Sequence, residues 1–270
     1  MALKLTEILG RDARSTERLL PRLTAVLALA LYLTGLAPGL VAGDAGELQA
    51  AAVGLGVAHP TGYPLYLQLG RLFFALGGTW GLNFLSALAM ALAAALAVRL
   101  AVRLTGSMVA AALAGILVIF GRMAWLEALS AEVYALSLAL QLACLNLTLE
   151  LRREGGAAGE AGRADGRLLA LLGLVYGLSL AHHLSALFLL PALLFLVPWR
   201  ELEPRAGALA AAALLLGLST YIYLPLRALS SAAVNWGDPR TLGAFLEHLR
   251  GAEYGTALFG GTAAGYLDRL

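Results

Sequence analysis

Long apolar segments separated by short polar ones run along almost the whole chain. They cover about 23–40, 82–103, 107–121, 131–150, 168–181, 184–198 and 206–226. A helix needs about 20 largely apolar residues to cross the hydrocarbon core of a bilayer, and several of these segments approach that length. The pattern therefore predicts an all-α, polytopic membrane protein, a bundle of about seven transmembrane helices within residues 23–227.

The first polar region, residues 41–81, holds two shorter helical patterns, Asp44 to about Leu55 and Tyr63 to about Leu76. Each is short for a transmembrane span, and the second contains Gln68 and Arg71, so we expect both helices at the membrane interface. The Pro-Thr-Gly-Tyr-Pro sequence at 60–64 separates them. After the last span, residues 228–270 are more polar and include an amphipathic piece near 241–250.

Composition supports a membrane protein. Hydrophobic residues make up 60% of the chain and charged residues 13%, whereas soluble domains are about half apolar and a quarter charged. The single cysteine, Cys144, lies in an apolar segment and excludes an intrachain disulfide. No cleavable signal peptide is apparent, so we expect the first span to act as an uncleaved signal anchor.

The positions of the basic residues predict the orientation. Of the 19 Lys and Arg residues, most fall in residues 1–22, at Arg99 and Arg103, in the loop 152–167, and at Arg200 and Arg205. Basic residues accumulate in cytoplasmic segments of membrane proteins. Residues 1–22 are therefore expected in the cytoplasm and the loop 41–81 on the extracytoplasmic side. Basic residues placed by topology in this way make nucleic acid an unexpected partner.

Asp44 and Glu47 stand three residues apart at the start of the first short helix. This spacing fits a capping box, with Asp44 as the N-cap and Glu47 at position N3. It also fits a carboxylate held at a helix start that serves as a general base. A cap would orient the carboxylate but lower its basicity, so the spacing alone leaves both interpretations open.

Four further polar side chains fall at the predicted outer ends of spans or in the predicted outer loop. His59 and Tyr63 border a proline-rich segment that is either a rigid turn with an interfacial tyrosine or part of a binding cavity. Glu132 is either a favourable acid at a helix start or a functional carboxylate. Arg227 either extends to the membrane interface or binds a phosphate.

The adjacent pair His182 and His183 is a weak metal signal, because histidines that share a metal on one helix are usually four residues apart. Adjacent side chains point in different directions. One is expected to hydrogen-bond to a neighbouring helix while the other faces a cavity. Ionisable residues beside the membrane are functional candidates by default.

Short motifs in a fixed order carry a resemblance to a known family. They are Gly-Asp-x-Gly-Glu (43–47), Ala-His-Pro-x-Gly-Tyr-Pro-Leu-Tyr (58–66), Asn-x-Leu-Ser-Ala (83–87), Ala-Glu-Val-Tyr-Ala-Leu (131–136), His-His (182–183), Tyr-Leu-Pro-Leu-Arg (223–227) and Asn-Trp-Gly-Asp-Pro (235–239). The series resembles the bacterial relatives of transmembrane protein 260, the "domain of unknown function 2723" proteins. These are grouped with protein O-mannosyltransferase-like enzymes of the GT-C glycosyltransferase fold, and the resemblance covers about residues 22–255.

The resemblance implies a GT-C-like bundle whose first outer loop carries a catalytic acid, at the place of Asp44, and two juxtamembrane helices. It implies transfer of a sugar, a hexose such as mannose, from a polyprenyl-phosphate carrier to a protein hydroxyl outside the cytoplasm. Arg227 with His182 or His183 would then stabilise the leaving phosphate. The remaining substrate-binding candidates would orient the acceptor or shape the cavity: Glu47, His59, Tyr63 and Glu132.

This scheme requires no metal and no cofactor besides the lipid-linked sugar donor. The expected partners are membrane lipids, the donor, a protein acceptor and a possible partner in a membrane complex, and the expected location is a bacterial inner membrane. Family members generally continue beyond this length, so residues 228–270 are expected to begin a longer outer loop. A non-catalytic membrane subunit is the main alternative. A transporter fits less well, because it predicts inverted repeats and polar residues at mid-membrane.

Overall fold

The computed structural model describes residues 2–157 and 166–252, with side chains from residue 19 onward except 154–157 and 201. Within these ranges the chain is helical, and the only β-type pairing there is an isolated bridge between Val57 and Asn235. This confirms the all-α prediction. The α-helices are α1 (Ala2–Gly35), α2 (Asp44–Gly54), α3 (Pro64–Thr105), α4 (Met108–Phe120), α5 (Arg122–Leu129), α6 (Val133–Ala157), α7 (Gly166–His182), α8 (Leu190–Leu196), α9 (Pro204–Leu218), α10 (Tyr223–Leu229) and α11 (Leu242–Arg250). Short 3-10 helices are η1 (Leu184–Leu189), η2 (Trp199–Glu201) and η3 (Ser219–Ile222).

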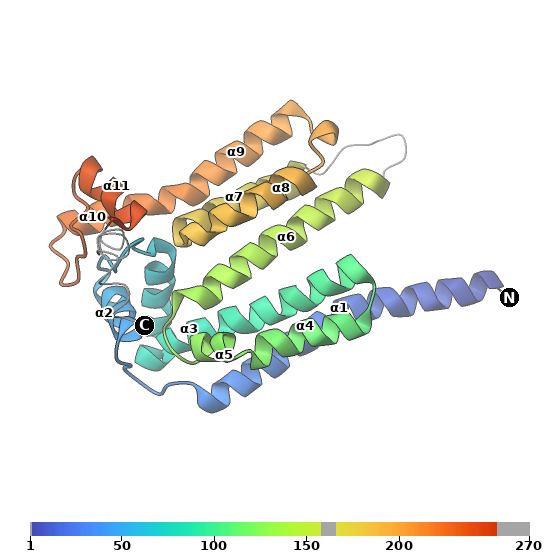
Figure 1. Ribbon diagram of the computed structural model, residues 1–270, viewed down its shortest axis with the longest axis horizontal. Coiled ribbons are helices and arrows are strands. Elements are labelled where there is room, and N and C mark those ends of the chain that lie inside the picture. Colours follow the sequence, from blue (N-terminus) through green and yellow to red (C-terminus); the bar gives the residue numbers. More distant parts are fainter. Residues whose placement is uncertain (1, 158–165, 253–270) are drawn as a thin grey trace, which may run out of the picture.

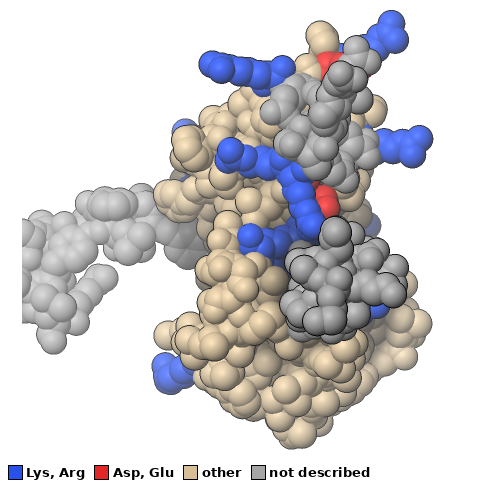
Figure 2. All heavy atoms as spheres, turned by 90° about the vertical axis from the view of Figure 1, so that its right-hand side faces the viewer, with Lys and Arg blue, Asp and Glu red and all other residues tan. Residues whose placement is uncertain are grey.

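The long helices run side by side and give the bundle two distinct ends (Figure 1). One end carries the start of α1, the turn between α3 and α4, the end of α6 and η2; we call it the basic end. The other end carries α2, α10 and α11, and we call it the α2 end. Figure 2 views the basic end, where Lys and Arg side chains predominate over Asp and Glu. The segments predicted to be cytoplasmic and those predicted to be outside are thus at opposite ends.

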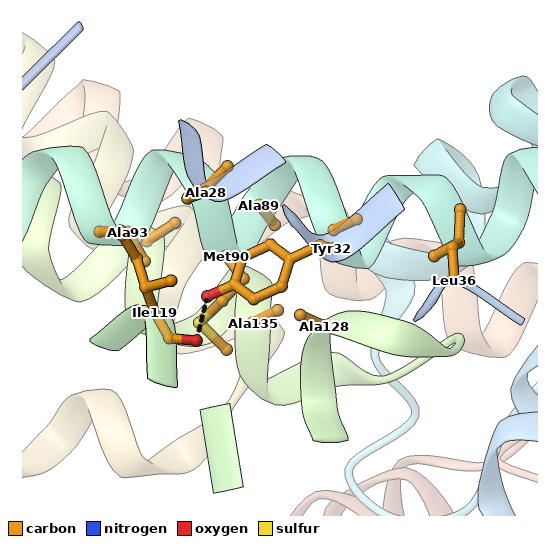
Figure 3. Packing of buried hydrophobic residues seen from close by; sticks show 13 residues of the cluster. Ala28, Tyr32, Leu36, Ala89, Met90, Ala93, Ile119, Ala128 and Ala135 are labelled. Carbon is orange, nitrogen blue, oxygen red and sulfur yellow. Dashed lines mark hydrogen bonds between the residues drawn. The ribbon is translucent and has the colours of Figure 1, made fainter. Parts of the chain in front are cut away.

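Mostly small residues of α1, α3, α5 and α6, together with Ile119 of α4, form one core (Figure 3). Tyr32 on α1 is fully buried there and donates its hydroxyl to the carbonyl oxygens of Val118 and Ile119, at 3.3 and 3.4 Å. Small side chains allow helices to approach closely in lipid, where no hydrophobic driving force distinguishes helix from lipid contacts. The core therefore relies on close packing of small residues around one hydrogen-bonded aromatic side chain.

Two glycines allow α7 and α9 to pack closely against each other. A Cβ atom at Gly173 would lie 2.3 Å from the carbonyl oxygen of Ala210, and one at Gly177 would lie 2.3 Å from that of Leu214. The two glycines are four residues apart, so they lie on one face of α7 and let the backbone of α9 pack against it. Any larger residue at either position would push α9 away.

Helix α3 is broken at Gly77 and Gly78, whose backbone dihedrals are not helical. Gly78 has a φ of 62°, a conformation that glycine adopts without steric cost. The break lets residues 64–76 fold back, and a Cβ at Gly81 would lie 2.2 Å from the carbonyl oxygen of Phe73. A short helix followed by a separate long one is what the sequence predicts here. The location of α2 and of residues 64–76 at the membrane interface stays a prediction.

Among the described residues, three helices are long and apolar enough to cross a membrane: Pro64–Thr105, Val133–Arg153 and Pro204–Leu229. Helices α4 and α5 together meet the same criterion but are bent by 53° at their junction. The apolar segments Leu19–Gly35, Gly166–His182 and Leu184–Leu196 are shorter. These findings support a membrane protein, and the number of seven spans stays a prediction.

Two local expectations were wrong. Residues after Phe120 were expected to form a loop, but Arg122–Leu129 is the helix α5, because its residues are mostly good helix formers. The segment 184–198 was expected to be one regular helix. It begins as the 3-10 helix η1 and becomes α-helical only at α8, where Pro191 occupies the first turn and its missing N–H costs no hydrogen bond.

Candidate active site

Helix α2 begins at Asp44, and its N-cap is the preceding residue, Gly43, with a φ of 76° and no side-chain cap. The capping box suggested by the sequence is therefore wrong, because Asp44 is the first helical residue and Glu47 does not cap the helix. The Asp44 side chain is exposed and makes no hydrogen bond or ion pair within the part of the chain that the structure describes. Its carboxylate remains accessible at a helix start, where the helix dipole favours a negative charge.

A buried amide pair holds the segment that leads into α2. Gln49, which is fully buried, donates to the side-chain oxygen of Asn83 at 2.7 Å and to the carbonyl of Gly39 at 3.2 Å. Its own side-chain oxygen accepts from the N–H of Val41 at 3.1 Å. Asn83 in turn donates to the carbonyl oxygens of Ala37 and Gly39 at 2.8 and 2.9 Å. These bonds fix the backbone just before Asp44 against α3.

Glu47 binds His59 instead of its own helix. Its carboxylate accepts from the backbone N–H of His59 at 2.7 Å and lies 3.1 Å from the Nδ1 atom of the same residue. The two side chains are 20% and 13% exposed. Two bonds to one partner fix the orientation of the imidazole, and hydrogen bonds to a carboxylate are stronger than neutral ones. The pair ties α2 to the segment before α3.

Tyr63 connects this pair to His182, the last residue of α7, and to His183, which follows it. Its ring centroid lies 5.1 Å from that of His59 and 6.1 Å from the rings of both His182 and His183. The preceding Gly62 has a φ of 85°, and a Cβ there would lie 2.7 Å from Leu224. Only glycine fits this turn, which brings the Tyr63 ring between the imidazoles.

The two adjacent histidines differ in burial and in partner. The expected hydrogen bond to a neighbouring helix is present, and the expectation that the other histidine faces a cavity stays a prediction. His182 is fully buried and donates from Nε2 to the carbonyl oxygen of Val133 at 2.8 Å, a bond between α7 and the start of α6. His183 is half-buried. Its Nδ1 accepts from the N–H of Ser185 at 3.1 Å, so in the neutral ring Nε2 carries the proton. Its ring lies 5.5 Å from that of Tyr134.

Glu132 lies in the short link between α5 and α6, and Ser86 on α3 holds its backbone. The Ser86 hydroxyl accepts from the N–H of Glu132 at 3.0 Å and lies 3.0 Å from the Tyr66 hydroxyl. Burial, with repulsion from Glu127 and Asp44, raises the pKa of the Glu132 carboxyl to about 7. Glu132 and Asp44, far apart in the sequence, thus act on each other electrostatically.

Arg227 lies at the far end of α2 from Asp44. Its guanidinium donates from Nε to the carbonyl oxygen of Leu55 and from a terminal nitrogen to that of Gly54, the latter at 3.3 Å. These carbonyls end α2, where a positive charge is favourable. Because α2 rises about 1.5 Å per residue, Arg227 is separated from Asp44 by about 15 Å along the helix axis. In this structure Arg227 therefore caps α2.

The Asn-Trp-Gly-Asp-Pro motif pairs with the segment between α2 and α3. Val57 donates its N–H to the carbonyl of Val234 at 2.8 Å, and the N–H of Trp236 donates to the carbonyl of Val57 at 3.1 Å. The Trp236 ring lies 6.5 Å from that of His59. The motif thereby lies beside His59, against the segment that joins α2 to α3.

The structure brings most of the predicted site residues together at the α2 end and leaves Arg227 at the periphery. The gathered residues are Asp44, Glu47, His59, Tyr63, Glu132, His182 and His183. The sequence analysis did not select Gln49, Tyr66 or Ser86 as site residues. Their buried hydrogen bonds support the segments that carry the site. The feature of the sequence that could have identified them is a polar side chain on an otherwise apolar helix face. Among the described residues no group of three or more His, Cys, Asp and Glu side chains could hold a metal ion.

Comparison with known proteins identifies the family. Residues 44–206 match the family described as the protein O-mannosyl-transferase TMEM260 N-terminal domain. A mouse protein named protein O-mannosyl-transferase TMEM260 is 36% identical over 237 residues, which cover 84% of this chain and 33% of that protein. A Dictyostelium discoideum protein of the same name is 26% identical over 241 residues, covering 83% of this chain and 29% of that protein.

The chain therefore spans about a third of the length of these curated relatives. No solved structure matches it. The family match begins at Asp44 and runs into α9, so it contains α2 and every other residue gathered at the α2 end. The chain belongs to the family of the protein O-mannosyl-transferase TMEM260 N-terminal domain.

Proposed function

We propose that this chain transfers mannose from a polyprenyl-phosphate carrier to a protein hydroxyl on the extracytoplasmic side of the membrane. The names of the relatives support mannosyl transfer to protein. The segregation of basic residues to the opposite end supports the sidedness. The observation that carries the proposal is the exposed Asp44 carboxylate at the start of α2, close enough to Glu132 for the two carboxylates to repel each other.

The reaction needs one base and one good leaving group. The acceptor oxygen attacks the anomeric carbon, its proton passes to Asp44, and the bond from that carbon to the phosphate oxygen breaks. The lipid phosphate leaves with the electron pair of that bond. Because attack and departure occur on opposite faces, the anomeric configuration inverts. The phosphate needs no proton to leave, so the site requires no general acid.

The neighbours of Asp44 have supporting functions. Glu132, with its raised pKa, orients the acceptor hydroxyl and can hold a proton near neutral pH. The His183 Nε2–H donates to the departing phosphate, and His182 and Glu47 position their neighbours through the bonds described above. Arg227 supports α2 and reaches a phosphate only if it releases the carbonyls of Gly54 and Leu55.

The direct test compares Asp44→Asn with the unaltered chain in membranes supplied with polyprenyl-phosphate mannose and an acceptor protein. Loss of a general base lowers the rate by about 10²–10⁴-fold, so we expect transfer to fall at least to the lower limit of this range. Glu247→Gln is the matched control, because Glu247 is an exposed carboxylate on α11, which also lies at the α2 end. It should leave transfer unchanged.

Two outcomes would overturn parts of the proposal. Transfer by Asp44→Asn at the rate of the unaltered chain would remove Asp44 as the base. Absence of transfer by the unaltered chain, while it copurifies with another membrane protein, would favour a non-catalytic subunit.

A further inference from the structure

Tyr134, the second residue of α6, is an aromatic side chain beside the site that the proposed function does not use. Its ring centroid lies 5.5 Å from that of His183, with an angle of 54° between the rings. The His183 ring also stacks on Tyr63, at 6.1 Å and 18°. Tyr63 is 5% exposed, whereas Tyr134 is 51% exposed. Of the two tyrosines that contact His183, Tyr134 is therefore the one whose ring a ligand can reach.

Three carboxylates act electrostatically on the Tyr134 side chain: those of Asp44, Glu127 and Glu132. They come from α2, from α5 and from the link between α5 and α6. Because electrostatic interactions weaken with distance, Tyr134 lies in the same neighbourhood as these acids. Ionised carboxylates are costly in lipid, so this neighbourhood is not the surface of the bundle that faces acyl chains. The exposed ring thus presents an apolar face among hydrogen-bond acceptors.

The proposed reaction restricts where the transferred sugar can lie. An inverting displacement needs the acceptor oxygen, the anomeric carbon and the leaving phosphate oxygen in line. The sugar must then lie between the base and the group that donates to the phosphate, which in the proposed function are Asp44 and His183. Tyr134 interacts with both of these residues, electrostatically with the first and through its ring with the second. Its ring is therefore next to the place that the sugar must occupy.

We propose that the Tyr134 ring packs against the C–H face of the hexose in the lipid-linked donor. The C–H groups of a pyranose ring form an apolar patch whose hydrogens are slightly positive, and the face of an aromatic ring is negative. The hydroxyl groups at the rim of the sugar can donate to the neighbouring carboxylates. The inference rests on the proposed function, because it assigns Tyr134 to the donor sugar of that reaction.

A tyrosine at the membrane interface is the other explanation for an exposed ring at this position. Trp80, just after the break in α3, offers a comparison. It is 41% exposed, and its ring stacks at 5.2 Å on Phe84, one turn later in the same helix. An interfacial ring contacts lipid whether or not a carrier holds a sugar. A ring that contacts the sugar affects only the carrier that holds one.

The test measures the Kd of two carriers for the purified full chain in detergent micelles. One is polyprenyl-phosphate mannose, and the other is polyprenyl methyl phosphate, which has the same charge and no sugar. Tyr134→Leu should weaken binding of the first about tenfold and change binding of the second less than about twofold. Tyr134→Phe keeps the ring, and Trp80→Leu removes an exposed ring outside the site. Both should bind each carrier within about twofold of the unaltered chain.

Three results would overturn the sugar contact. Tyr134→Leu could weaken both carriers equally, which would mean a contact with lipid or phosphate, or it could weaken neither. Tyr134→Phe could lose as much affinity as Tyr134→Leu, which would assign the contact to the hydroxyl instead of the ring. Retained binding of the sugar-free carrier shows that a variant is folded. If Tyr134→Leu does not fold, Tyr134→Gln takes its place and should show the same selective loss.

Transfer measured on the same preparations separates this inference from the proposed function. Selective loss of donor binding in Tyr134→Leu, with no transfer by the unaltered chain, would support the sugar contact and overturn the reaction. Transfer by the unaltered chain, with donor binding unchanged in Tyr134→Leu, would support the reaction and overturn the contact. If both hold, Tyr134→Leu should raise the donor KM about tenfold with little change in kcat, because the contact is made before and during the reaction. If the unaltered chain binds neither carrier, both proposals are overturned.

Discussion

The two ends of the bundle use charged side chains in different ways. At the α2 end, Glu47 pairs with His59, Arg227 caps a helix and the buried amides satisfy each other, while Asp44 remains accessible. At the basic end, Glu150 on α6 accepts hydrogen bonds from Arg99 and Arg103 on α3. The first arrangement holds polar side chains in fixed orientations near an accessible carboxylate, and the second joins two helices through charged groups that bind each other. The comparison separates bonds that position the surroundings of an accessible group from bonds that connect two helices.

The largest expected effect comes from the buried amide pair. Gln49→Leu keeps the side-chain size but leaves Asn83 and the N–H of Val41 without their partner. Each buried polar group left unsatisfied costs about 1–3 kcal/mol, so we expect the free energy of unfolding to fall by about 3 kcal/mol. Denaturation in mixed micelles measures this change.

The matched control is Gln68→Leu, because Gln68 is exposed and bonds only to the carbonyl of Pro64 in its own helix. It should have little effect. If Gln68→Leu lowered the free energy of unfolding as much as Gln49→Leu does, the buried amide pair would contribute no more than an exposed amide.

A smaller effect is expected from the Glu47–His59 pair. Glu47→Ala removes the acceptor of two bonds from one residue, and hydrogen bonds to charged groups contribute about 1.5–3 kcal/mol, so we expect a loss of about 2 kcal/mol in the free energy of unfolding. Glu247→Ala, an exposed glutamate on α11, is the control. If the pair is coupled, the double variant Glu47→Ala/His59→Ala should cost less than the sum of the single variants. Strict additivity would contradict the pairing.

The smallest effect depends on pH. The pKa of Glu132 is raised to about 7 in the folded chain, so the folded state binds a proton that the unfolded state has already released. The wild-type glutamate therefore destabilises the fold increasingly as the pH rises from about 4.5 to about 7, and constantly above that. The melting temperature of Glu132→Gln should exceed that of the unaltered chain by an amount that grows over this range.

In the Asp44→Asn background, the difference in melting temperature caused by Glu132→Gln should grow over a narrower pH range. The reason is that Asp44 contributes to the raised pKa of Glu132. A difference in melting temperature that does not vary with pH would mean that Glu132 is not held in this environment.

Patterns within short stretches of sequence were reliable here. Apolar segments predicted the helices, glycines and prolines predicted the break before the long part of α3, and basic residues predicted two chemically different ends. The amphipathic piece near 241–250 is α11, and Cys144, which lies in an apolar segment, is buried. These features depend on periodicity, hydropathy and backbone restriction, which act over a few residues and so can be deduced from the chain itself.

Partnerships between distant residues could not be predicted in this way. The spacing of Asp44 and Glu47 fits a cap, yet Gly43 caps α2 and Glu47 binds His59. Arg227 had the chemistry of a phosphate ligand, yet it bonds to carbonyls 172 and 173 residues earlier. The sequence by itself determined which polar residues gather at each end of the bundle. Only the tertiary structure decided which of them meet, because packing chooses among many partners of similar chemistry.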